Sequence, residues 1–196
     1  MTHPVANPEP EDFTADGVPY DMVTKGRDLY ILEANSGALD RVSTRTGSIS
    51  RVIDISATQG HIVPTALDRQ GKNFYVGNLG TFPITPGTEN IYRISPNGKL
   101  KAVASGLTAI LGVAFDDDQR MYVLETSTTG PFPNPGAGQI VRQSRSGSWE
   151  TVVSGLTYPS AMIFGPDDAL YVSTNGYNNP AAGEGQVVRV DVDHHH

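Results

Sequence analysis

The segment Leu170-Tyr171-Val172 decides the fold, because the chain repeats this apolar-Tyr-apolar pattern three more times. The other copies are Leu29-Tyr30-Ile31, Phe74-Tyr75-Val76 and Met121-Tyr122-Val123. Their tyrosines lie 45, 47 and 49 residues apart. Self-similarity with a period of about 20 to 50 residues is typical of repeat proteins, in which each copy is one supersecondary unit.

Each copy lies among other short apolar stretches that Gly, Pro, Asp or Asn separate, as in Ser95-Pro96-Asn97-Gly98. One stretch precedes the tyrosine, one follows it and carries an arginine, and a fourth appears after three of the copies. The arginines are Arg41, Arg93, Arg142 and Arg189. Four short strands per repeat predict β-propeller blades. An ordinary β-sandwich is the alternative, but it does not require so regular an order of strands.

We therefore predict an all-β chain with one propeller domain over residues 1–193. Its four-stranded blades are expected at about residues 17–56, 61–107, 108–156 and 157–193. The fourth repeat ends after its third strand, so the four blades fit either a six-bladed ring or a pair of copies that closes an eight-bladed ring. The final residues, 194–196, are three histidines and are interpreted as a purification tag.

Composition excludes several classes of protein. The 196 residues include no Cys, which removes disulfides, thiolate zinc sites and a Cys nucleophile. Lys and Arg number 14 against 21 Asp and Glu, and a net charge of −7 argues against a nucleic-acid partner. No apolar run approaches the roughly 20 residues that span a membrane. The first residues, 1–4, lack the basic and apolar regions of a signal peptide.

Several motifs resemble the ScyD/ScyE family of bacterial propeller proteins over essentially the whole chain. The matching segments are Asp16-Gly17-Val18-Pro19-Tyr20, Gly60-His61-Ile62-Val63-Pro64-Thr65, Tyr75-Val76-Gly77-Asn78-Leu79-Gly80-Thr81-Phe82-Pro83, Tyr122-Val123-Leu124-Glu125, Ser154-Gly155-Leu156 and Gly165-Pro166-Asp167-Asp168-Ala169-Leu170-Tyr171-Val172-Ser173. The resemblance implies an exported, six-bladed protein of which this chain would form the last four blades. A secreted or periplasmic location is expected on that ground.

Polar residues follow each tyrosine strand and form a candidate metal site. They are Glu33 (with Asn35), Asn78, Glu125 and Asn175 (with Asn178). Carboxylate and amide oxygens suit Ca²⁺ or Mg²⁺, and gluconolactonase-type propellers resemble this chain in using Glu and Asn around a channel Ca²⁺. The alternative is that these are ordinary turn residues.

Other candidates would act at the mouth of the central channel. His61, the single histidine away from the termini, and Glu125 are candidate acid/base residues, although a loop histidine bonded to backbone is the simpler interpretation. Tyr20, Thr65 and Ser160 occupy comparable positions early in three inner strands. Their hydroxyls either bind a polar ligand or satisfy backbone groups.

Two proline-rich insertions, residues 79–90 and 127–138, follow tyrosine strands and should project from the same end of the propeller. Phe82 and Phe132 give each an apolar tip, which either grips a small-molecule or protein ligand or packs over a neighbouring blade. The repeated arginines are expected to be structural, pairing with acidic turns between blades.

The function expected from these features is binding or scaffolding outside the cytoplasm. The alternative is a metal-dependent lyase or lactonase that acts at the central channel. Self-association through open blade edges is a further expectation, because an uncovered sheet would leave apolar surface exposed.

Overall fold

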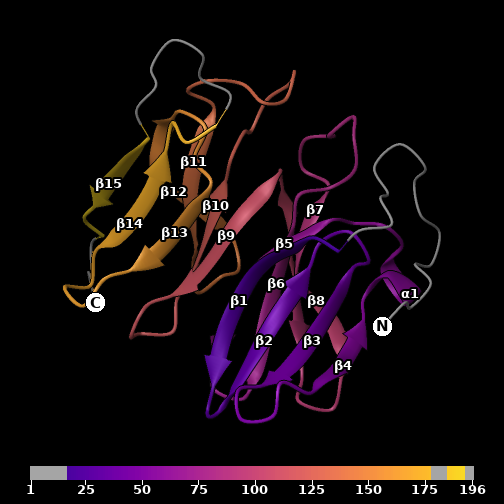
Figure 1. Cartoon of the computed structure of the whole chain (residues 1–196). Coiled ribbons are helices and arrows are strands. Elements are labelled where there is room, and N and C mark those ends of the chain that lie inside the picture. The colour runs from indigo at the N-terminus through magenta and orange to yellow at the C-terminus, as the bar shows by residue number, and fades with distance from the viewer. Residues whose placement is uncertain (1–16, 178–184, 193–196) are drawn as a thin grey trace.

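The computed structural model of the chain describes residues 17–177 and 185–192 and shows four antiparallel sheets (Figure 1). We number these sheets blade 1 to blade 4 in chain order. The predicted tag at 194–196 and the candidate Asn178 lie outside the described residues. No helix within the described ranges has the length and apolar character to cross a membrane.

In each blade the strands pair in chain order, from the inner strand at the centre of the molecule to the outer strand. Blade 1 contains β1 (Pro19–Lys25), β2 (Asp28–Glu33), β3 (Ala38–Ser43) and β4 (Ile49–Asp54). Blade 2 contains β5 (Pro64–Gln70), β6 (Asn73–Asn78), β7 (Glu89–Ile94) and β8 (Leu100–Leu107). Blade 3 contains β9 (Ile110–Phe115), β10 (Met121–Glu125), β11 (Gly138–Gln143) and β12 (Trp149–Leu156). Blade 4 contains β13 (Ala161–Phe164), β14 (Leu170–Thr174) and β15 (Gln186–Val190).

The blades are arranged radially, because β1, β5, β9 and β13 contact one another in chain order. A one-turn helix, α1 (Ser56–Gln59), connects blade 1 to blade 2. The prediction of an all-β propeller is confirmed, with four strands in each of the first three blades and three in the described part of blade 4.

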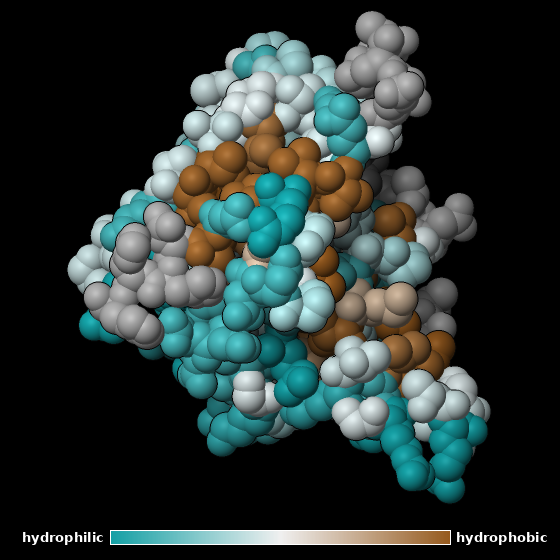
Figure 2. Space-filling view, turned by 90° about the vertical axis from the view of Figure 1, so that its left-hand side faces the viewer, coloured by the Kyte–Doolittle hydropathy of each residue, from teal (hydrophilic) through white to brown (hydrophobic). Residues whose placement is uncertain are grey.

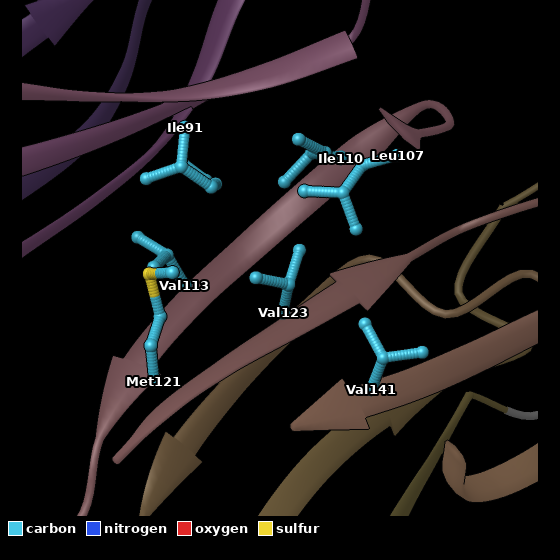
Figure 3. Close-up of a cluster of buried hydrophobic side chains, with 8 residues drawn as sticks. Ile91, Leu107, Ile110, Val113, Met121, Val123 and Val141 are labelled. Atoms are coloured by element: carbon cyan, nitrogen blue, oxygen red, sulfur yellow. The ribbon is translucent and has the colours of Figure 1, made fainter. Parts of the chain in front are cut away.

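Residues of β10 are buried on both faces of its sheet, which explains why this strand lacks a polar face. Met121 and Val123 pack into a cluster shared with blade 2 (Figure 3). The alternate residues, Tyr122 and Leu124, pack into a cluster shared with blade 4. Since successive side chains of a strand point to opposite faces, a middle blade needs apolar residues at every position.

The repeated tyrosines join each blade to the next. The ring of Tyr30 lies 4.4 Å from that of Phe74, and Tyr75 lies 4.7 Å from Phe115. Tyr122 lies 5.1 Å from Phe164 on blade 4 in an edge-to-face arrangement. Such aromatic pairs favour offset or edge contacts, so the repeat that predicted the fold also supplies its inter-blade contacts.

Candidate functional site

A cavity of about 420 Å³ lies at the centre of the described blades, lined by their inner strands. Three side chains predicted to line the channel, Tyr20, Thr65 and Ser160, are brought together on its wall. Met22 and Phe164 are among its apolar lining residues. The volume lies within the range of about 300 to 1,000 Å³ that is common for small-molecule sites.

Two of the three hydroxyls also make contacts within the protein. The Thr65 hydroxyl donates to the carbonyl oxygen of Ile110 on blade 3, at 2.6 Å. The hydroxyl oxygens of Ser160 and Ser173 lie 2.9 Å apart. Thr65 therefore links two blades, and its lone pairs remain the part of the group that a ligand could contact.

Two carboxylates in the cavity wall, Asp21 and Asp68, were missed from the sequence. Asp21 accepts a hydrogen bond of 2.7 Å from the backbone N–H of Leu67 on the next blade. Asp68 accepts one of 3.1 Å from the backbone N–H of Phe115. The signal available was an acidic residue beside apolar residues in each of two inner strands, Asp21 before Met22 and Asp68 after Leu67.

Burial raises the pKa of both aspartates above the ordinary value, and backbone N–H donors partly oppose that effect. The charge of Asp68 adds to the rise in the pKa of Asp21. The cavity wall therefore combines hydroxyl groups with two nearby acidic groups, a composition that favours ligands rich in hydrogen-bond donors.

Tyrosines from blades 1 and 4 gather near one another. Burial first, and then the charge of Tyr177, raises the pKa of Tyr20. The ring of Tyr177 lies 5.4 Å from that of Tyr158, and its hydroxyl lies 2.6 Å from the hydroxyl of Thr126. Comparison of the repeats does not reveal this group, because blades 2 and 3 have no tyrosine at the positions that match Tyr158 and Tyr177.

The candidate metal ligands Glu33 and Glu125 are bound by N–H donors of their own blades. Glu33 accepts from the backbone N–H groups of Val18 and Ser36. Glu125 accepts 2.6 Å hydrogen bonds from the Thr108 backbone and from the side-chain amide of Gln139. Burial raises the pKa of Glu125, while these donors oppose the rise. Each glutamate thus holds the segment that precedes the inner strand of its blade.

Asn78 and Asn175 occupy different positions in their repeats. Asn78 is buried, donates to Glu89 and accepts a 3.1 Å hydrogen bond from the backbone of Asn90. The backbone of Asn175 donates to Thr157, as the residue after Asn78 does to Val63. Thr174, rather than Asn175, is therefore the blade 4 counterpart of Asn78.

The structure therefore places Glu33, Asn78 and Glu125 at matching points of three blades, each bonded within its own blade. No group of three or more His, Asp or Glu side chains in residues 17–177 and 185–192 is arranged to hold a metal ion.

His61 is buried, with 7% of its surface exposed, and lies between α1 and β5. Both of its ring nitrogens are buried without a hydrogen-bond partner, so no hydrogen bond joins it to Glu125. An unsatisfied buried polar group is costly and calls for a functional or solvent partner.

The predicted rim residues Phe82 and Phe132 contact each other across blades 2 and 3, with ring centroids 5.4 Å apart in an edge-to-face arrangement. Phe82 remains half exposed. The two insertions thus meet over neighbouring blades and still present apolar surface at that end of the propeller.

No protein-family model and no curated protein matches this sequence. Solved structures do match. An aldose sugar dehydrogenase from Streptomyces coelicolor in its PQQ-bound form has a TM-score of 0.65 at 15% identity, over 91% of this chain and 61% of that chain. A luciferin-regenerating enzyme has a TM-score of 0.58 at 14% identity, over 83% and 57% of the two chains. The protein is a β-propeller.

A structure of a putative gluconolactonase also matches, with a TM-score of 0.56 at 17% identity over 95% of this chain and 71% of that chain. This chain spans about three fifths of the length of the dehydrogenase and the luciferin-regenerating enzyme. At these identities the likeness concerns the fold alone, and propellers support many unrelated functions.

Proposed function

We propose that this propeller binds a small polar molecule in its central cavity. The observation that carries the proposal is that three hydroxyl groups and two carboxyl groups line the same cavity, whose volume is about 420 Å³. These residues are Tyr20, Thr65, Ser160, Asp21 and Asp68. Carboxylate oxygens accept hydrogen bonds and attract cations, so an amine or a polyol is the favoured class of ligand.

Thermal-shift and calorimetric titration with a panel of monosaccharides and short diamines tests this proposal. Tyr20→Phe and Ser160→Ala each remove one hydroxyl, and we expect each to weaken binding about tenfold. Thr46→Ala removes a hydroxyl from an exposed turn outside the cavity and serves as the control. Equal affinities in all variants would contradict the proposal.

A second candidate function is hydrolysis or elimination at the channel, with His61 and Glu125 as acid/base residues. The buried and unpartnered ring nitrogens of His61 favour it, because a catalytic imidazole must keep a nitrogen available. The putative gluconolactonase among the structural matches makes δ-gluconolactone a reasonable first substrate. Turnover that survives in His61→Gln would contradict this candidate.

The ScyD/ScyE relationship, an extracytoplasmic location and self-association are also proposed. Support for self-association comes from Val187 on β15, the last described strand of blade 4, whose side chain is 70% exposed. Figure 2, which views the molecule from the side of blade 4, shows hydrophobic residues gathered on that face. A contiguous exposed apolar patch is typical of a contact surface. A purely monomeric mass in light scattering would contradict self-association.

A further inference from the structure

A second cavity, of about 550 Å³, lies between blades 2 and 3. Gln70 at the end of β5 and Gln119 in the β9–β10 hairpin line it, so it opens at the end opposite the proline-rich insertions. Its wall includes three arginines and two aromatic rings, together with one carboxylate, Asp118: the arginines are Arg93, Arg120 and Arg145, and the rings are Tyr75 and Phe115.

The repeated arginines explain why this groove differs from the rest of the propeller. Three of them are neutralised by carboxylates. Arg41 lies 2.7 Å from Asp28, and Arg142 lies 3.0 Å from Glu150. Arg189 pairs with Asp167 at 2.9 Å. A structural role therefore fits three of the four arginines, but each pairs with a carboxylate of its own blade and not with an acidic turn between blades.

Arg93 is the blade 2 member of the repeated arginines. At the positions where blades 1 and 3 have the carboxylates that bind Arg41 and Arg142, blade 2 has a neutral and a basic residue. Arg93 pairs in register with Tyr75, as Arg41 pairs with Tyr30. Two residues before these tyrosines, blade 1 has Asp28 but blade 2 has Asn73. On the outer strand, Lys101 faces Arg93 where Glu150 faces Arg142. Among the residues that the structure describes, no carboxylate forms an ion pair with Arg93.

Arg145 brings a second guanidinium to the same groove from the exposed β11–β12 turn. It too has no ion pair within the described ranges. The third arginine, Arg120, is held by Asp116 at 2.6 Å and by Asp118 at 3.3 Å. Arg93 and Arg145 are therefore the two cationic groups that a ligand would meet, in a protein whose net charge is −7.

The corresponding groove between blades 1 and 2 provides an internal comparison. Its volume is about 240 Å³, and its basic side chains already have partners. Arg41 binds Asp28, Arg51 lies 2.6 Å from Asp40, and Lys25 lies 5.1 Å from the centroid of the Phe74 ring. Blades 2 and 3 thus have both the larger groove and the uncompensated charge.

We propose that the groove between blades 2 and 3 binds an organic oxyanion, a phosphate or carboxylate carried on an aromatic ring. Arg93 and Arg145 bind the anionic group, since guanidinium donors match the geometry of both oxyanions. The edge-to-face pair of Tyr75 and Phe115, 4.7 Å apart, supplies an apolar wall for the ring.

Isothermal titration of the whole chain at low salt with phenyl phosphate, benzoate, inorganic phosphate and benzyl alcohol tests the proposal. We expect phenyl phosphate or benzoate to bind more tightly than inorganic phosphate, and benzyl alcohol not to bind. The preference between phenyl phosphate and benzoate identifies the oxyanion. Failure of both aromatic anions to bind at about 10 mM would overturn the proposal.

Variants with matched controls locate the binding. Arg93→Gln and Arg145→Gln should each weaken binding about tenfold, whereas Arg41→Gln and Arg45→Gln change the corresponding arginines of blade 1 and should have no effect. Circular dichroism and the melting temperature confirm that each variant is folded. If Arg41→Gln and Arg45→Gln weaken binding as much as Arg93→Gln and Arg145→Gln do, the attraction is non-specific and the site is overturned.

Asn73→Asp gives a test that removes no arginine. The new carboxylate would stand where Asp28 neutralises Arg41, so it should pair with Arg93 and weaken binding about tenfold. Asn73→Ser changes the same side chain without adding charge and should bind like the original protein. Unchanged binding in Asn73→Asp would contradict the role of Arg93.

Discussion

The Oδ2 atom of Asp21 on β1 accepts a hydrogen bond of 2.7 Å from the backbone N–H of Leu67 on β5. The other carboxylate oxygen, Oδ1, accepts one of 2.7 Å from the backbone of Met22. One side chain therefore joins the inner strands of blades 1 and 2. Asp68 does the same between blades 2 and 3 through Phe115. Blade docking in this propeller thus depends on buried polar groups as well as on apolar clusters.

Asp21→Ala should lower the free energy of unfolding by about 1–3 kcal/mol, because it leaves the Leu67 N–H without its acceptor. Asp21→Asn keeps an acceptor oxygen and should lose less. Urea denaturation followed by tryptophan fluorescence and circular dichroism measures both. Equal stability of Asp21→Ala and the original protein would show that the inter-blade bond contributes nothing.

The pH dependence of stability should carry a contribution from Asp68. Burial raises the pKa of Asp68 in the folded state. Its favourable contribution to the free energy of unfolding is therefore complete at a pH below the ordinary aspartate pKa, and it is lost as the pH rises through the raised pKa. The original protein should therefore lose more stability between about pH 4 and pH 7 than Asp68→Asn does. Asp117→Asn, at an exposed hairpin position, is the control and should keep the original slope.

Gly77→Ala should destabilise the protein by about 1–3 kcal/mol. A Cβ atom at Gly77 would lie 2.6 Å from Cγ2 of Ile110, a fully buried side chain on blade 3. Blades 2 and 3 would have to separate to relieve the overlap. Gly176→Ala is the control, since its Cβ would meet no atom of the described residues within 4 Å. Melting temperatures of the two variants provide the test, and equal values would contradict this close approach.

Removal of divalent ions should leave the melting temperature unchanged, because no group of three or more His, Asp or Glu side chains in the described residues is arranged to hold a metal ion. Differential scanning calorimetry with EDTA and with added Ca²⁺ measures this. A rise with Ca²⁺ that disappears in Glu125→Gln would instead establish the metal site predicted from the sequence.

The sequence predicts the blades well because their strands are local patterns. The spacing of Tyr30, Tyr75 and Tyr122 identifies the repeat, and the same rings pack against aromatic rings of the next blade. The sequence also placed Phe82 and Phe132 at one end of the propeller. Their contact with each other could not be predicted, because it depends on how the two insertions fold over neighbouring blades.

Aligning repeats was less informative for the candidate site. Glu33 and Glu125 occupy matching positions, but residue type could not reveal that backbone N–H groups already occupy their oxygens. In blade 4 the candidate Asn175 lies four residues after its tyrosine, whereas Glu33, Asn78 and Glu125 lie three residues after theirs. Thr174 is the counterpart both by this spacing and by the backbone hydrogen bonds.

By itself, the sequence determined that this protein is built of repeated four-stranded units, because strand alternation and turn residues act over a few neighbouring positions. The tertiary structure alone decided which charges meet. Asp21 bonds to Leu67, 46 residues further along the chain. Arg93 lines the groove between blades 2 and 3 without a carboxylate partner among the described residues, whereas its blade 1 counterpart, Arg41, pairs with Asp28. Such relationships depend on the docking of whole sheets, since Coulomb and hydrogen-bond energies follow distance in space rather than along the chain.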